Sequence, residues 1–141
     1  MSFFKSLESK AKTEWMDEYG HLNIQFYLKL FNDAWVNLFR DMDLDIFASE
    51  TGVVASRILM SHRAEVCENE NLEIHSGFSA IHKNYVTVKQ KLSVEGRTRA
   101  TCDARLYAFD LRVRKMGEFS AMHLEKAGRY KISGAEDCFE E

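Results

Sequence analysis

The residues best suited to chemistry lie close together near the start of the chain. Within seven positions the sequence holds an aspartate, a glycine, a histidine and an asparagine: Asp17, Gly20, His21 and Asn23. The carboxylate of Asp17 could take a proton from water as a general base or attack a carbonyl carbon as a nucleophile. The residues themselves leave both roles open.

An amphipathic helix is expected directly after this stretch. Apolar residues recur at helical spacing over residues 23–40: Ile24, Tyr27, Leu28, Phe31, Ala34, Trp35 and Leu38. This spacing predicts a helix with one buried face and with Asn23 as its N-cap. Asp17 then precedes a helix N-terminus, where unpaired N–H groups carry partial positive charge and can hold an oxyanion. A carboxylate beside such donors is the core of a hydrolytic site.

The rest of the chain shows the alternation of apolar and polar residues that is typical of strands. We expect strands over residues 11–17, 54–66, 72–80, 85–94 and 100–110, and a short helix over 118–127. Residues 1–10 are expected to form a short helix or a loose end, and residues 130–141 a solvated, mobile end. Long strands with short turns pair as antiparallel neighbours, and the one long helix must cover a face of the sheet. The sequence therefore predicts an α+β fold and one domain over residues 1–141.

Composition narrows the possible functions. The net charge of −3 argues against a nucleic-acid binder, and no G-x-G-x-x-G or P-loop motif indicates a cofactor. The three cysteines are widely spaced and odd in number, which predicts no metal site and reduced thiols in a cytoplasm. No apolar run is long enough to span a membrane, and the first residues do not have the pattern of a signal peptide.

The pattern Asp-x-x-Gly-His-x-Asn-x-x-x-Tyr, which runs from Asp17 to Tyr27, resembles the opening motif of a known family. The family is the 4-hydroxybenzoyl-CoA-thioesterase-like group of hotdog-fold acyl-CoA thioesterases, and the similarity extends over about residues 13–110. The resemblance implies a hotdog fold, in which an antiparallel sheet curls around one long central helix. It also implies an acyl-CoA substrate and a catalytic role for Asp17 as general base or nucleophile. Catalytic roles for its neighbours are expected from their residue types: His21 could orient Asp17 or donate to the substrate, and Asn23 could hold the attacking water or the carbonyl. Substrate-binding roles follow for Gly20, Ile24 and Tyr27.

Two further expectations concern the partners of the chain. Arg112, Arg114 and Lys115 form a basic cluster after the last long strand, and such side chains could bind the phosphates of CoA. Hotdog domains pair their sheets across a two-fold axis, so the resemblance also implies a homodimer or a dimer of dimers.

Two other readings stay open. Related enzymes that hydrate or dehydrate acyl thioesters pair an aspartate with a histidine, as Asp17 and His21 could do. Their motif has an Asn-Pro pair, however, and this chain contains no proline. A protein that keeps the fold only to bind a ligand or to assemble is the third possibility, and Asp17 argues against it.

Overall fold

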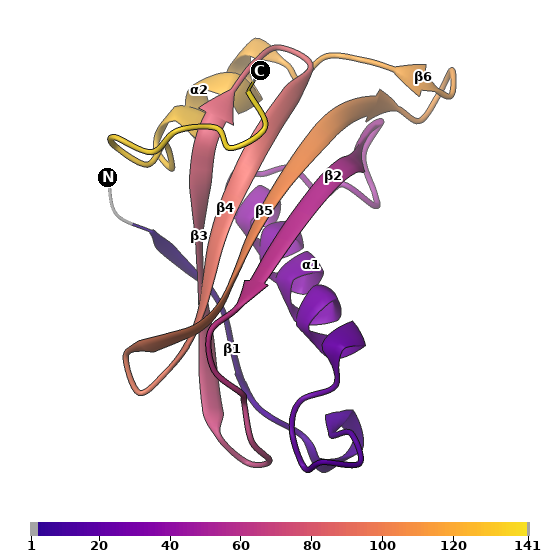
Figure 1. Cartoon of the computed structure of the whole chain (residues 1–141). Coiled ribbons are helices and arrows are strands. Elements are labelled where there is room, and N and C mark those ends of the chain that lie inside the picture. Colours follow the sequence, from indigo (N-terminus) through magenta and orange to yellow (C-terminus); the bar gives the residue numbers. More distant parts are fainter. Residues whose placement is uncertain (1–2, 141) are drawn as a thin grey trace.

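The structure is a computed structural model of the chain and describes residues 3–140. Residues 1, 2 and 141, which the single-domain prediction includes, lie outside that range. In chain order the elements are β1 (Phe4–Lys10), a 3-10 turn (Thr13–Trp15), α1 (Ile24–Asp41), β2 (Thr51–His62), β3 (Asn71–Ile81), β4 (Tyr85–Val94), β5 (Arg97–Asp110), β6 (Lys115–Met116) and α2 (Ala121–Gly128) (Figure 1).

The strands form one antiparallel sheet in the order β1-β3-β4-β5-β2, with β6 paired to the end of β5. Strands β1 and β2 are the edges of this sheet within residues 3–140. The register between β2 and β5 shows which residues lie at each end of the β2 edge, and this places the site relative to the end of β5. Thr51 lies opposite Asp110 at one end, and His62 lies opposite Ala100 at the other.

Helix α1 lies along one face of the sheet, and the strands curve around it (Figure 1). Its buried face consists of Tyr27, Leu30, Phe31, Ala34, Trp35, Val36, Leu38 and Phe39. These side chains pack against the inward-pointing residues of β3, β4 and β5, such as Ile74, Val88 and Leu106. The predicted helix and the predicted α+β arrangement are confirmed. The buried face is narrower than predicted, since Ile24 is 65% exposed and Leu28 is 38% exposed.

The prediction for the N-terminal residues was wrong. Residues 4–10 form strand β1, which pairs with β3 from Phe4 opposite Ser76 to Lys10 opposite Asn71. The strand expected over residues 11–17 is instead the 3-10 turn and an irregular segment. The partner of β1 lies more than sixty residues further along the chain. Local alternation therefore gives no sign of the pairing.

Strand β2 also differs from its prediction. It ends at His62, and residues 63–66 continue as an irregular segment rather than as strand. Most of its side chains are exposed, including Val54, Ile58 and Leu59 at 43%, 41% and 50%. Exposed apolar side chains on an unpaired sheet edge are a feature that surfaces pairing with another chain often have.

The C-terminal end was predicted to be loose, and it is instead packed on the sheet. The tail crosses the face of the sheet opposite α1 (Figure 1). Arg105 on β5 forms an ion pair of 2.6 Å with Asp137, whose side chain is only 5% exposed. Phe139 is buried and lies under the guanidinium groups of Arg57 and Arg105. The contacts of Asp137 and Phe139 therefore hold the tail against the sheet. These contacts join residues that are far apart in the sequence.

Candidate active site

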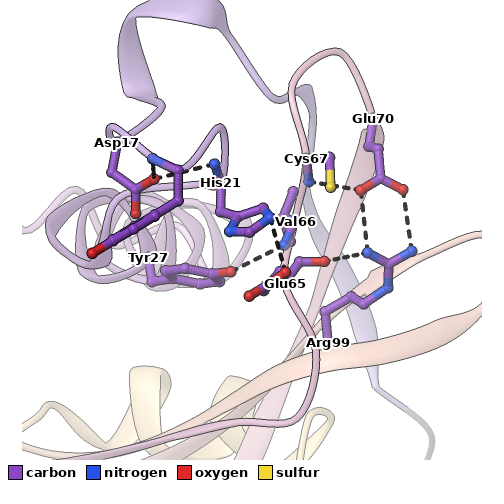
Figure 2. A network of polar contacts seen from close by, with 9 residues as sticks. Asp17, His21, Tyr27, Glu65, Val66, Cys67, Glu70 and Arg99 are labelled. Carbon is purple, nitrogen blue, oxygen red and sulfur yellow. Dashed lines mark hydrogen bonds and ion pairs between the residues drawn. The ribbon is translucent and has the colours of Figure 1, made fainter.

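Asp17 lies in a tight turn that its own side chain organises. Its Oδ1 accepts hydrogen bonds from the backbone N–H groups of Tyr19 (2.8 Å) and His21 (3.2 Å) (Figure 2). The backbone of Asp17 also pairs with that of His21, and the Gly20 N–H donates to the Asp17 carbonyl. Gly20 has a φ of 79°, a left-handed conformation that glycine adopts without strain. The turn therefore fixes the orientation of the Asp17 carboxylate.

Helix α1 begins just after this turn. The Asn23 side chain accepts the Gln25 N–H at 3.2 Å, as an N-cap does. Within residues 3–140 the Ile24 N–H has no hydrogen-bond acceptor. Ile24 N–H is thus an open donor at the positive end of the helix dipole, and a developing negative charge on oxygen could use it.

The segment that follows β2 closes the site from the other side. The Leu22 N–H donates to the Val66 carbonyl at 2.8 Å, and His21 pairs with Cys67 through the backbone. The Val66 N–H donates to the Tyr27 hydroxyl at 3.3 Å. Burial raises the pKa of Tyr27, so this phenol stays protonated at neutral pH. Tyr27 is therefore a hydrogen-bonding group of the site rather than a base.

A pocket of about 410 Å³ lies between the turn, the start of α1 and the end of β2. Its lining includes Asp17, His21, Ile24, Tyr27, His62 and Glu65. The imidazole Nε2 of His21 lies 2.9 Å from a carboxylate oxygen of Glu65. His62 packs its ring edge-on against Tyr27 with 4.6 Å between the centroids. Acidic, imidazole and apolar groups thus meet around one open cavity.

The backbone of Glu65 is held by Arg99, which also forms an ion pair with Glu70. The Arg99 guanidinium binds both carboxylate oxygens of Glu70 at 3.2 and 3.1 Å, and it also donates to the Glu65 carbonyl oxygen (Figure 2). The Glu70 carboxylate also accepts a hydrogen bond of 2.7 Å from the Cys67 N–H. The Arg99 hydrogen bonds lower the pKa of Glu70, and Glu70 raises that of Arg99. Both groups are therefore charged at neutral pH.

Most of the predicted site residues come together here. Asp17, His21, Ile24 and Tyr27 line the pocket, and Gly20 and Asn23 shape the turn and the helix start beside it. Sequence reasoning missed Glu65, Glu70 and Arg99. These residues are distant in sequence from Asp17, and no local pattern joins them to it.

The predicted phosphate-binding cluster lies elsewhere. Arg112 and Arg114 follow the Asp110 end of β5, whereas the pocket adjoins the His62 end of β2. At about 3.3 Å per residue, the eleven steps from Thr51 to His62 separate these ends by roughly 35 Å. Arg112 pairs with Asp110 (3.3 Å) and Glu50 (3.5 Å). The cluster is therefore not part of the pocket within one chain.

Comparison with known families decides the classification. The model of the thioesterase-like superfamily matches residues 11–127. The chain belongs to this superfamily. As a member of the thioesterase-like superfamily it is a thioester hydrolase, which confirms the enzyme class that the motif predicted. No curated protein matches the chain.

Solved structures with similar folds support the hotdog architecture of this thioesterase-like protein. A hypothetical protein from Staphylococcus aureus in complex with CoA is 12% identical, with a TM-score of 0.85 over 100% of this chain and 96% of the other. A predicted thioesterase from Bacillus stearothermophilus is 14% identical, with a TM-score of 0.82 over 92% and 97%. A gentisyl-coenzyme A thioesterase is 10% identical, with a TM-score of 0.79 over 86% and 98%. The predicted hotdog fold is confirmed.

No helix within residues 3–140 combines the length and the apolar character needed to cross a membrane.

Proposed function

We propose that this thioester hydrolase acts on acyl-CoA substrates in the pocket beside Asp17. The observation that carries the proposal is that Asp17 lines the same cavity as Ile24, the first residue of α1. Oδ1 of Asp17 is engaged by the turn, so Oδ2 is the oxygen left for the reaction. The structure complexed with CoA among the similar folds supports CoA as the carrier.

The reaction needs an attacking oxygen and a site for negative charge. Asp17 takes a proton from water as the water oxygen bonds to the thioester carbon, or its carboxylate attacks that carbon directly. The carbonyl oxygen becomes negative and is stabilised by the Ile24 N–H and the dipole of α1. When the carbonyl forms again, the C–S bond breaks and the thiolate leaves. In the direct route, attack by the Asp17 carboxylate leaves a mixed anhydride between Asp17 and the acyl group, and water then hydrolyses this anhydride.

The phosphates of CoA could be held by a second subunit. The exposed edge of β2 suits antiparallel pairing with the same strand of another copy around a two-fold axis. Such pairing places the Thr51 end of one β2 beside the His62 end of the other. The partner subunit's Arg112, Arg114 and Lys115 then approach this pocket. In the homodimer predicted from the resemblance, the pocket residues of one subunit and the basic cluster of its partner would thus lie close together.

The test is release of free thiol from a panel of acyl-CoAs, run beside hydration of an enoyl-CoA. Hydrolysis of at least one acyl-CoA without hydration of the enoyl-CoA is the expected result. A pure, folded preparation that is inactive in both assays would favour a binding module. Hydration without hydrolysis would favour the hydratase reading.

A further inference from the structure

We propose that Glu65 is a positioning residue of this active site, which acts through His21. Its carboxylate holds the His21 imidazole in one orientation and one tautomer within the pocket. The proposal rests on the thioesterase function argued above. It adds a residue that lies outside the Asp17–Tyr27 motif and forty-four positions after His21.

The first support is the direct contact. His21 Nε2 and a carboxylate oxygen of Glu65 lie 2.9 Å apart, and both side chains line the pocket that contains Asp17. The backbone of His21 is fixed independently, because its N–H donates to Asp17 and its chain pairs with Cys67. Only the side-chain torsions of His21 remain to be set. The contact with Glu65 sets them.

The second support is the fixed backbone of Glu65. Its side chain is 65% exposed, and an exposed carboxylate on an unrestrained segment would contribute little order. Here the Arg99 guanidinium binds the carbonyl oxygen of Glu65 while it forks onto Glu70. The next residue, Val66, is bonded to Tyr27 through its N–H and to Leu22 through its carbonyl. The carboxylate is therefore attached to a backbone that hydrogen bonds hold at Glu65 itself and at Val66 (Figure 2).

The chemistry follows from which ring nitrogen is engaged. A carboxylate accepts a hydrogen bond from Nε2–H, so Nδ1 is left as the nitrogen that can take up and release a proton. Net hydrolysis moves one proton from the attacking water to the leaving sulfur. When Nδ1 relays that proton from Asp17, or from the water that hydrolyses the anhydride, to the sulfur, the ring is an imidazolium, and the negative charge of Glu65 stabilises it. Loss of Glu65 removes both the orientation and the charge.

A double-mutant cycle with Glu65→Ala and His21→Gln tests this role. Glu65→Ala is expected to lower kcat about 10-fold and to change KM little. A loss of this size is typical when a residue that orients a functional imidazole is removed. If Glu65 acts through His21, the double variant will be no slower than His21→Gln alone. Independent, multiplying losses in the double variant would overturn the proposal.

Two further variants separate positioning from general damage. Glu65→Gln keeps an acceptor for Nε2–H and should recover a large part of the rate that Glu65→Ala loses. No recovery would contradict the orienting role. Glu68→Ala removes an exposed carboxylate three residues away and should leave kcat unchanged. Equal losses in Glu68→Ala and Glu65→Ala would show a non-specific effect of charge and overturn the role.

The ¹⁵N resonances of the His21 ring supply a readout that does not depend on turnover. The wild-type protein is expected to show the tautomer protonated at Nε2, and Glu65→Ala a mixture of both tautomers. An unchanged tautomer in Glu65→Ala would contradict the proposal. A folded wild-type protein without any thioesterase activity would overturn the proposed function and this role with it. An active wild type that Glu65→Ala leaves unaffected would overturn only the role of Glu65.

Discussion

Asp17 accepts a hydrogen bond from the backbone N–H of His21 over 3.2 Å, so the proposed base and the proposed imidazole belong to one turn. The same carboxylate accepts the Tyr19 N–H. Asp17 therefore has a structural role and a proposed chemical role at the same time. Substitutions that delete the side chain would confuse the two roles, whereas asparagine keeps the Oδ1 acceptor and removes only the charge.

The edge of β2 leads to a prediction about assembly. Ile58→Glu places a charge in the middle of this edge, where Ile58 is already 41% exposed, so the subunit should still fold. Pairing of two β2 strands should fail, because two buried carboxylates would face each other near the axis. Sedimentation should report a homodimer, or a dimer of dimers, for the wild type and a monomer for Ile58→Glu.

Met122→Glu is the matched control, since Met122 is exposed on α2 away from the β2 edge. It should assemble like the wild type. A wild-type monomer at micromolar concentration, or unchanged assembly of Ile58→Glu, would contradict the proposed interface.

The tail contact predicts a stability effect that depends on pH. Burial alone would raise the pKa of Asp137, but hydrogen bonds from the Phe139 N–H and Arg105 outweigh it and hold the pKa below its usual value. A depressed pKa in the folded state contributes stability that is present above about pH 4 and is lost as the pH falls further. Asp137→Asn should lower the free energy of unfolding by about 3 kcal/mol at pH 7, because it leaves Arg105 partly buried without its charged partner.

Urea unfolding at pH 7 and at pH 3 measures both parts of this prediction. The difference between Asp137→Asn and the wild type should be smaller at pH 3, below the ordinary pKa of an aspartate, because protonation of Asp137 in the unfolded chain then offsets part of the ion pair. Glu140→Gln, which changes an exposed carboxylate in the same tail, should behave like the wild type at both pH values. Equal stability of Asp137→Asn and the wild type at pH 7 would show that the ion pair contributes nothing.

The fold could be predicted where the pattern is local. Helix α1 was placed within one residue of its bounds because its apolar period persists for five turns. The β3–β4–β5 meander followed from alternation and short turns. Strand β1 was missed since its pairing with β3 is distant in sequence. The order of the tail was missed because it depends on Arg105 and Phe139 meeting across the sheet.

The candidate site likewise has a local part that could be predicted from the sequence and a part built from distant residues that could not. The turn from Asp17 to Asn23 is local, so its residue types and spacing could be recognised in the sequence. The contribution of Glu65 depends on Arg99 and Glu70, which the sheet brings together from different strands and turns. The single-domain prediction, the cytoplasmic location and the catalytic roles stay predictions.

The basic cluster predicts a split between kinetic constants. If Arg112, Arg114 and Lys115 bind CoA phosphates from the partner subunit, they hold ground state and transition state alike. Changing all three to glutamine should raise KM for an acyl-CoA and leave kcat nearly unchanged. The wild-type KM should also rise with salt, because exposed charges are screened over about 8–10 Å at physiological ionic strength.

The control for the cluster is a truncated thioester that lacks the nucleotide. Its KM should be the same for the wild type and for the triple variant. An equal rise in KM for both substrates would show that the cluster has no specific contact with the nucleotide.

The most direct test of the proposed mechanism is the turnover number of Asp17→Asn on an acyl-CoA that the wild type hydrolyses. Asparagine retains the acceptor for the Tyr19 and His21 N–H groups, so the melting temperature should stay close to that of the wild type. Loss of the charge should lower kcat by at least ~100-fold, the usual scale for a lost acid–base group. Glu18→Gln, a neighbouring exposed carboxylate, should keep full activity. Near-wild-type turnover of Asp17→Asn would contradict the assignment of Asp17 as base or nucleophile.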